Sequence, residues 1–240
     1  MNLKNNQTSM TSMTSRILNG TKFHSFLENE GADQGMANLF TMAGSQETSV
    51  ENADVIIFNG GADLGTILYG EHPIQRGIPE QPSRRDRMEM DLYYRFKGGS
   101  KLLLGICKGA QMLNVLNGGT LWQDVNNHGR SHNMTVLATG QTIYVTSTHH
   151  QMMRPNLKTS KVLATADCAT KKYADPDTWN ANGGVFYPDD HKDTEIVWYP
   201  STGSLCIQGH PEYVPNSEFA TFCLDMVVHY LEEVRVKCVV

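Results

Sequence analysis

The chain has 240 residues and a formal net charge of −5, and hydrophobic residues make up 40% of it. This is the composition of a globular protein, and the length suits a single α/β domain with a well-filled core. The charge gives no electrostatic case for binding nucleic acid or an acidic membrane surface, and no apolar run is long enough to span a bilayer.

Short apolar runs alternate with longer helical patterns, which predicts an α/β fold with a mostly parallel sheet and helices on both faces. The polar stretch 1–15 lacks the apolar centre of a signal peptide, and we expect a flexible tail there. A first strand is expected at 16–19, and a strongly buried one at 54–58, ahead of an Asn-Gly-Gly turn. The charge-rich stretch 84–97 predicts an exposed helix that ends at a Gly-Gly pair.

The second half of the chain continues this alternation. A buried strand at 102–106 leads directly into Cys107, and an apolar helix follows it. Further strands are predicted at 141–147 and 205–207. The pattern after Ser217 predicts a long final helix with this serine as its N-cap.

The cysteines and one stretch of biased composition add two further expectations. The five cysteines show no CxxC pair and no regular spacing, which argues against a zinc site or a disulfide framework and favours a reducing cytoplasm. The stretch 168–194 is rich in Asp, Asn, Gly and Pro, and we expect a long surface loop or small insertion near the active face. With no repeat or convincing linker, residues 16–240 are predicted to form one domain.

The five residues 105–109 read Gly-Ile-Cys-Lys-Gly, a nucleophile elbow with Cys107 in the usual place of serine. Side chains at the glycine positions would collide with the adjacent strand and helix, so the pattern predicts a strained turn that presents the sulfur. Such a turn lies at the carboxyl edge of the sheet, where α/β proteins bind ligands. It also places Cys107 at a helix N-terminus, which favours the reactive thiolate.

About a hundred residues later, the sequence Gln-Gly-His-Pro-Glu offers a base and an orienting carboxylate, His210 and Glu212. Pro211 between them favours an extended backbone, in which side chains two apart point the same way. We therefore predict a catalytic triad of Cys107, His210 and Glu212.

Several spaced blocks resemble the class I glutamine amidotransferase superfamily, and within it the stand-alone γ-glutamyl hydrolases typified by γ-glutamyl-γ-aminobutyrate hydrolase. The matching blocks occur in the family's order, at 58–73, 84–92, 102–125, 146–151 and 208–213. The resemblance implies a flavodoxin-like fold, one catalytic domain over 16–240 and the same triad. It implies hydrolysis of a γ-glutamyl amide bond through a thioester, with no metal or organic cofactor.

The resemblance also implies roles for residues around the triad. The oxyanion hole would be made by the backbone N–H groups of Gly61, in the Gly60-Gly61 loop, and Lys108. The family usually has arginine where Lys108 stands, and since only its N–H is needed we expect little consequence. Gln111 matches the position that contacts the glutamyl group.

His149 and His150 match a segment that lines the same pocket, so they and Gly60 are further candidates for substrate binding. Plainer interpretations stay open for each of these positions. The glycine pair could be only a tight turn, Gln111 could cap a backbone group, and the two histidines could be a polar strand end. A solvated charged face would explain Arg85, Asp86 and Glu89 equally well.

His128 and His132 are spaced like metal ligands on a helix. Gly129 lies between them and no acidic third ligand is placed nearby in the sequence, so we predict no metal site.

Two other functions compete with a cytoplasmic hydrolase of a small γ-glutamyl substrate. The chain could be the glutaminase half of an amidotransferase that passes ammonia to a separate synthetase partner. The length leaves no second domain for a synthetase, which favours the hydrolase. A catalytically silent binding module is the third interpretation, and a homodimer stays open for all three.

Overall fold

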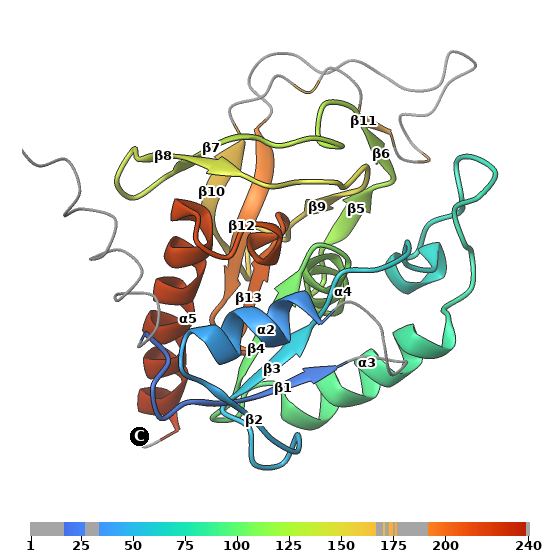
Figure 1. Cartoon of the computed structure of the whole chain (residues 1–240). Helices are drawn as coiled ribbons and strands as arrows, with labels where there is room; N and C mark the ends of the chain where they lie inside the picture. The colour runs from blue at the N-terminus through green and yellow to red at the C-terminus, as the bar shows by residue number, and fades with distance from the viewer. Residues whose placement is uncertain are drawn as a thin grey trace, which may run out of the picture.

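A nine-stranded sheet forms the centre of the molecule (Figure 1). The computed structural model describes residues 17–26, 34–166, 170, 173–174, 176 and 192–238. The strands of the sheet are, in chain order, β1 (Lys22–Phe26), β2 (Gln46–Glu47), β3 (Val55–Phe58), β4 (Leu102–Ile106), β7 (His132–Val136), β8 (Thr142–Val145), β10 (Lys161–Ala166), β12 (Asp193–Tyr199) and β13 (Ser204–Ile207). Their order in space is β2-β1-β3-β4-β13-β12-β10-β7-β8.

The sheet has two halves that differ in strand direction. Strands β2, β1, β3, β4 and β13 pair in parallel, and we call them the parallel half. Strands β12, β10, β7 and β8 follow on in antiparallel pairs, and we call them the antiparallel half. Two small antiparallel sheets pair β5 (Thr120–Trp122) with β9 (Met152–Arg154) and β6 (Asp124–Val125) with β11 (Tyr173–Ala174).

Helices cover both faces of the sheet, so the predicted α/β class is confirmed (Figure 1). Helices α2 (Gly35–Met42) and α5 (Glu218–Lys237) pack on one face, and α3 (Arg84–Phe96) and α4 (Lys108–Leu116) on the other. Strand β3 shows why both layers are needed, because Val55 and Ile57 belong to the first core and Ile56 and Phe58 to the second. A strand that is apolar on both sides is stable only when both faces are covered.

Most of the predicted elements are confirmed within a residue or two. The strands expected at 54–58, 102–106, 141–147 and 205–207 correspond to β3, β4, β8 and β13. The last helix begins where predicted, because Oγ of Ser217 accepts a hydrogen bond from the N–H of Ala220 at 3.1 Å.

Two local predictions are wrong. Residues 17–20 form a turn rather than a strand, and the first strand follows at β1. Pro211 does not extend the chain but begins the short 3₁₀ helix η2 (Pro211–Tyr213), since proline suits the first position of a helical turn.

Other predictions can be compared with the structure only in part. The predicted tail at 1–15 and most of 168–194 lie outside the described residues, and Asp193 already belongs to β12. Across the described ranges, no helix is both long and apolar enough to cross a bilayer. Four of the cysteines are described, and they are free thiols: Cys107, Cys206, Cys223 and Cys238.

Candidate active site

Cys107 lies in a strained turn between β4 and α4. Its backbone has φ 50° and ψ −108°, a conformation that L residues adopt only when the surrounding structure enforces it, at a cost of about 1–3 kcal/mol. The flanking glycines make the turn sterically feasible. A Cβ on Gly105 would lie 2.6 Å from Cα of Ala110, and one on Gly109 would lie 2.0 Å from the carbonyl oxygen of Phe58. The steric reason for the Gly-x-Cys-x-Gly pattern is therefore visible at both positions.

His210 follows β13, the neighbour of β4 in the sheet, and it faces the turn that carries Cys107. Its Nδ1–H donates to Oε1 of Glu212 at 2.7 Å, so the 3₁₀ turn at Pro211 brings the two side chains together without an extended chain. Burial disfavours a charged ring here, but hydrogen bonds with Cys107 and Glu212 outweigh it and raise the pKa of His210 to about 10. The imidazolium form is thus stabilised beside the cysteine sulfur.

Two further contacts hold His210 in place. Its backbone N–H donates to the carbonyl oxygen of Thr146 at 2.8 Å, which ties it to the end of β8. The ring of Tyr213 stacks on the imidazole with centroids 4.3 Å apart and planes within 6°. A Cβ on Gly60 would lie 3.0 Å from Cε1 of His210, so the glycine leaves room for the imidazole.

The loop at Gly60-Gly61 is held by Arg85, which reaches across from α3. Nη1 of Arg85 donates to the carbonyl oxygen of Gly60 at 2.8 Å, and Nη2 donates to that of Asn59 at 2.7 Å. The Asn59 side chain donates to the carbonyl oxygen of Phe26 at 2.9 Å, which fixes the loop to β1 as well. The loop is therefore an anchored element of the site, and more than a tight turn.

The side chain of Lys108 is buried, and it forms ion pairs with two carboxylates of α3. Its Nζ lies 2.8 Å from Oδ1 of Asp86 and also contacts Oε2 of Glu89, and all three side chains are at most 3% exposed. Nε of Arg85 donates to the other oxygen of Glu89 at 2.8 Å. The alternative of a solvated charged face is therefore wrong for Asp86 and Glu89. The side chain of Lys108 therefore has a structural role, contrary to the expectation that only its N–H is needed.

These charged groups stabilise one another in the protein interior. Desolvation disfavours the Asp86 carboxylate, but the charge and hydrogen bond of Lys108 outweigh it and lower the pKa of Asp86 below its ordinary value. Since Arg85 also bonds the glycine loop, this buried cluster links α3 to both predicted oxyanion donors, Gly61 and Lys108.

A pocket of about 280 Å³ opens beside Cys107. It is lined by Gly61, Asp63, Cys107, Gln111, Thr148, His149, His150, Gln151, His210 and Tyr213. Residues from both halves of the sheet thus contribute, because the segment 148–151 follows β8 of the antiparallel half. Six of the predicted site residues line this pocket, namely Cys107, His210, Gly61, Gln111, His149 and His150. Glu212 is behind His210, and Gly60 and Lys108 adjoin lining residues in the chain without lining the pocket themselves.

Gln111 and His149 each have one nitrogen bonded to the backbone of Gln151. Nε2 of Gln111 donates to the carbonyl oxygen of Gln151 at 2.9 Å, so Gln111 lines the pocket and also bonds a distant backbone group. Nδ1 of His149 donates to the same carbonyl oxygen at 2.8 Å, while its Nε2 lies 3.9 Å from Oε1 of Glu195. His149 therefore forms part of the wall and keeps both nitrogens turned to the protein.

His150 is the half-exposed cation of the pocket. Its Nε2 lies 3.2 Å from Oδ1 of Asp63, and its Nδ1 lies 3.5 Å from Oδ1 of Asp124. Hydrogen bonds to Asp124 and Asp63 raise the pKa of His150 to about 10, against the effect of partial burial. The pocket therefore presents a positive ring next to a carboxylate.

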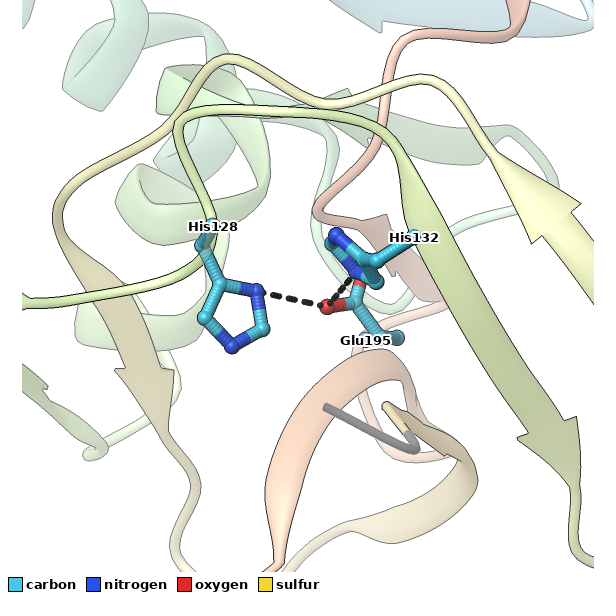
Figure 2. Close-up of side chains that lie close together, drawn as sticks. All are labelled: His128, His132 and Glu195. Atoms are coloured by element: carbon cyan, nitrogen blue, oxygen red, sulfur yellow. Dashed lines mark hydrogen bonds and ion pairs between the residues drawn. The ribbon is translucent and has the colours of Figure 1, made fainter. Parts of the chain in front are cut away.

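Two features of the structure differ from the premises on which the prediction of no metal site rests. His128 lies in a loop and His132 begins β7, so the two are not on a helix, and Glu195 of β12 supplies the missing acidic side chain (Figure 2). His128, His132 and Glu195 offer ligand atoms that all lie within 4.8 Å of one another. Glu195 carried no sequence signal, because it is far from both histidines along the chain.

Sequence reasoning also missed Asp63, Tyr213 and the anchoring role of Arg85. Asp63 and Tyr213 lie inside the matching blocks 58–73 and 208–213, so an examination of every polar or aromatic residue of these blocks could have found them. Arg85 belongs to a charge-rich helix, and its contact with the loop depends on how α3 packs, which the sequence does not reveal.

The fold, with a nucleophile elbow where β4 meets α4, is similar to that of a solved glutamine amidotransferase. A solved structure of a glutamine amidotransferase from Thermotoga maritima is similar over 90% of this chain and 98% of its own, with a TM-score of 0.56 and 13% identity. A GMP synthase subunit from Thermoplasma acidophilum is similar over 90% and 94%, with a TM-score of 0.54 and 12% identity. At these identities the likeness concerns the fold alone.

The chain belongs to the peptidase C26 family, whose sequence model matches residues 3–171. A relative from Lactococcus lactis subsp. cremoris, named glutamine amidotransferase-like protein YvdE homolog, is 41% identical over 73 residues, which are 30% of this chain and 38% of the relative. Protein NtpR of Enterococcus hirae is 33% identical over 79 residues, 33% of each chain. The match thus spans little more than a third of these relatives. Family and fold support a cysteine-dependent amidohydrolase of the glutamine amidotransferase-like class.

Proposed function

We propose that this protein hydrolyses a γ-glutamyl amide bond through a γ-glutamyl thioester on Cys107. One observation carries the proposal: the strained cysteine and the His210–Glu212 pair meet at a pocket large enough for an amino-acid-sized substrate. The raised pKa of His210 supports an imidazolium beside the sulfur.

The proposed reaction has two steps. The Cys107 thiolate attacks the γ-carbonyl carbon, and His210 gives its proton to the leaving nitrogen as the C–N bond breaks. His210 then takes a proton from water, whose oxygen attacks the thioester, and glutamate leaves as the sulfur is released. Glu212 holds the imidazole in the tautomer that both steps need.

The negative oxygen of each tetrahedral intermediate would be held by the backbone N–H groups of Gly61 and Lys108. Support for these donors comes from their anchoring, since Arg85 fixes the glycine loop and a buried ion cluster fixes Lys108. Donors that do not move are the ones that stabilise a developing charge most effectively, and the loss of one typically costs about 100-fold in rate.

The pocket wall supports an amino-acid head group as the bound part of the substrate. A glutamyl group carries an α-ammonium and an α-carboxylate. Asp63 and His150 offer one carboxylate and one imidazolium side by side on that wall. Gln111 and His149 would contribute shape, since Nε2 of Gln111 and Nδ1 of His149 are bonded to the backbone.

Cys107→Ala tests the proposal, with Cys238→Ala at the exposed end of α5 as the matched control. A panel of γ-glutamyl amides, glutamine included, would be assayed for glutamate release. We expect Cys107→Ala to lose at least about 1000-fold in kcat/KM and the control to be unchanged. Retained turnover in Cys107→Ala would contradict the mechanism.

A glutaminase subunit that passes ammonia to a synthetase is the second candidate. The solved GMP synthase subunit has the same fold, which makes this candidate worth testing. Glutamine would then be the preferred member of the panel, and its turnover would rise sharply on adding a synthetase partner. A silent binding module would show no fast-reacting thiol when the cysteines are alkylated near neutral pH.

A further inference from the structure

Behind the pocket wall lies a cluster of buried side chains that the proposed reaction does not use. Its members are His128, His132, His149 and Glu195, and each is at most 8% exposed. They come from four separate segments: the loop before β7, the start of β7, the segment after β8, and β12. Figure 2 shows His128 and His132 approaching the carboxylate of Glu195 from different directions.

Three imidazole nitrogens converge on one oxygen of Glu195. Oε1 lies 3.0 Å from Nε2 of His132, 3.3 Å from Nδ1 of His128 and 3.9 Å from Nε2 of His149. The carboxylate is fully buried, and a buried charge is stable only when it is paired or coordinates a metal. Among the described residues, the side chains that could pair with this oxygen are these histidines, and they carry a positive charge only when protonated.

The opposite nitrogens of His132 and His149 face carbonyl oxygens. Nδ1 of His132 lies 3.0 Å from the carbonyl oxygen of Arg130, and Nδ1 of His149 lies 2.8 Å from that of Gln151. A carbonyl oxygen accepts but does not donate, so both Nδ1 atoms carry protons. In the neutral rings, each Nε2 therefore points a lone pair at Glu195, and that of His149 makes no hydrogen bond within the described structure.

His128 has the same arrangement with a carboxylate as its outer partner. Its Nε2 lies 3.0 Å from Oδ2 of Asp193, while its Nδ1 faces Glu195. Metal-binding histidines almost always donate their outer N–H to a carboxylate or a backbone carbonyl, which fixes the tautomer and presents the inner lone pair. All three rings of the cluster follow this pattern.

We propose that His128, His132 and Glu195 bind a divalent transition-metal ion of the zinc type, with His149 as the fourth ligand. Imidazole and carboxylate ligands suit zinc, and bonds of about 2.0–2.1 Å to a tetrahedral ion place ligand atoms roughly 3.3 Å apart. The separations of 3.0 and 3.3 Å between Glu195 and two of the rings are close to that spacing, and the third ring is 3.9 Å away. A positive ion among the inward lone pairs turns their mutual repulsion into four bonds.

The ion would act on structure, because Cys107 and His210 need no metal for the proposed reaction. It joins β12, β7 and the segment after β8, and His149 is part of the pocket wall. The metal site would therefore hold together the segments of the antiparallel half that carry the pocket wall. Metal content can be measured whether or not Cys107 is catalytic. The metal site can therefore be confirmed or refuted independently of the proposed function.

The test uses the full chain carrying Cys107→Ser, so that zinc cannot bind the reactive thiolate. Bound metal is measured by mass spectrometry, and the chelator-treated protein is then titrated with Zn²⁺ and Co²⁺. We expect one equivalent of metal and visible d–d bands for Co²⁺ without a thiolate-to-metal band. The melting temperature should rise by about 5 °C or more when free Zn²⁺ exceeds Kd by ~100-fold.

Variants then assign the site. Glu195→Gln and His132→Gln should each weaken Zn²⁺ binding by at least about 100-fold, whereas His72→Gln, an exposed histidine far along the chain, should leave it unchanged. Substoichiometric binding by the intact protein would overturn the proposal, and that measurement does not require any variant to fold. A cobalt spectrum with thiolate bands, or full affinity in both cluster variants, would overturn it as well.

Discussion

On the wall of the pocket formed by the parallel half, the reactive groups are positioned by backbone geometry. Cys107 has a positive φ, and Gly105 and Gly109 leave no space for a methyl group. On the facing wall, formed after β8, polar side chains set the arrangement, with His149 near Glu195 and His150 between two carboxylates.

This difference predicts which substitutions each wall of the pocket can accept. Steric repulsion is short-ranged and steep, so the wall formed by the parallel half should lose its geometry when a single heavy atom is added. Side-chain electrostatics weaken gradually with exposure, so the effect of a change on the other wall should depend on how deeply the altered group is buried. Mutations that add volume or remove charge can therefore separate the two walls.

The largest effect is expected from removing the buried charge beside the elbow. Lys108→Met leaves Asp86 and Glu89 buried without their ammonium partner, which should lower the free energy of unfolding by about 3–5 kcal/mol. Lys97→Met, on an exposed lysine just after the same helix α3, is the control and should change it by less than ~0.5 kcal/mol. Denaturant unfolding at neutral pH measures both.

The pH dependence of that loss has a definite sign. Lys108 depresses the pKa of Asp86 below its ordinary value, so its stabilisation is complete above that ordinary value and is lost as pH falls through the depressed pKa. The difference between wild type and Lys108→Met should therefore shrink in acid. If the difference in the free energy of unfolding between the two proteins stayed constant down to the lowest pH measured, the ion cluster would not account for the stability.

An added methyl group tests the steric account of the elbow directly. Gly109→Ala places a Cβ 2.0 Å from a backbone oxygen and should cost at least about 3 kcal/mol, with loss of the elbow geometry. Gly129→Ala, in the loop before β7, meets nothing within 4 Å and should cost less than ~0.5 kcal/mol. Equal unfolding midpoints for the two variants would refute the steric account of the elbow.

The same contrast explains which parts of the site could be predicted from the sequence. The elbow was predictable because its requirements, a strand, two glycines and a helix start, lie within a few consecutive residues. The metal cluster was not, because Glu195 is 63 positions from His132 and reaches it only through pairing of strands in the antiparallel half.

Local patterns also misled where a distant partner decides the outcome. Asp86 and Glu89 resembled a solvated helix face, and only the packing of α3 on α4 shows that Lys108 neutralises them in the interior. Leu18 suggested a strand, yet its side chain is buried from within a turn. The fold class survives such errors because it depends on many elements at once.

A smaller effect is expected from the carboxylate that orients His210. Glu212→Gln keeps the shape but removes the charge, and kcat/KM should fall by about 100-fold. Glu212 helps to raise the pKa of His210 to about 10, so without it the imidazolium is lost at lower pH. The alkaline limb of the pH profile should move to lower pH. Glu232→Gln on the exposed face of α5 serves as control, and an unmoved limb in Glu212→Gln would argue against the proposed pairing.

The smallest effect is expected at the half-exposed cation of the side-chain wall. His150→Gln removes the positive ring beside Asp63, so KM for a γ-glutamyl substrate should rise about fivefold, the value of an ion pair worth ~1 kcal/mol at such a site. His72→Gln is the matched control, because His72 also lies beside a carboxylate, 3.1 Å from Glu80, and is far more exposed. Steady-state kinetics should show an unchanged kcat in both variants, since neither ring touches the reacting atoms. A fall in kcat without a change in KM would move His150 from substrate binding to catalysis, and the division between the two walls would no longer hold.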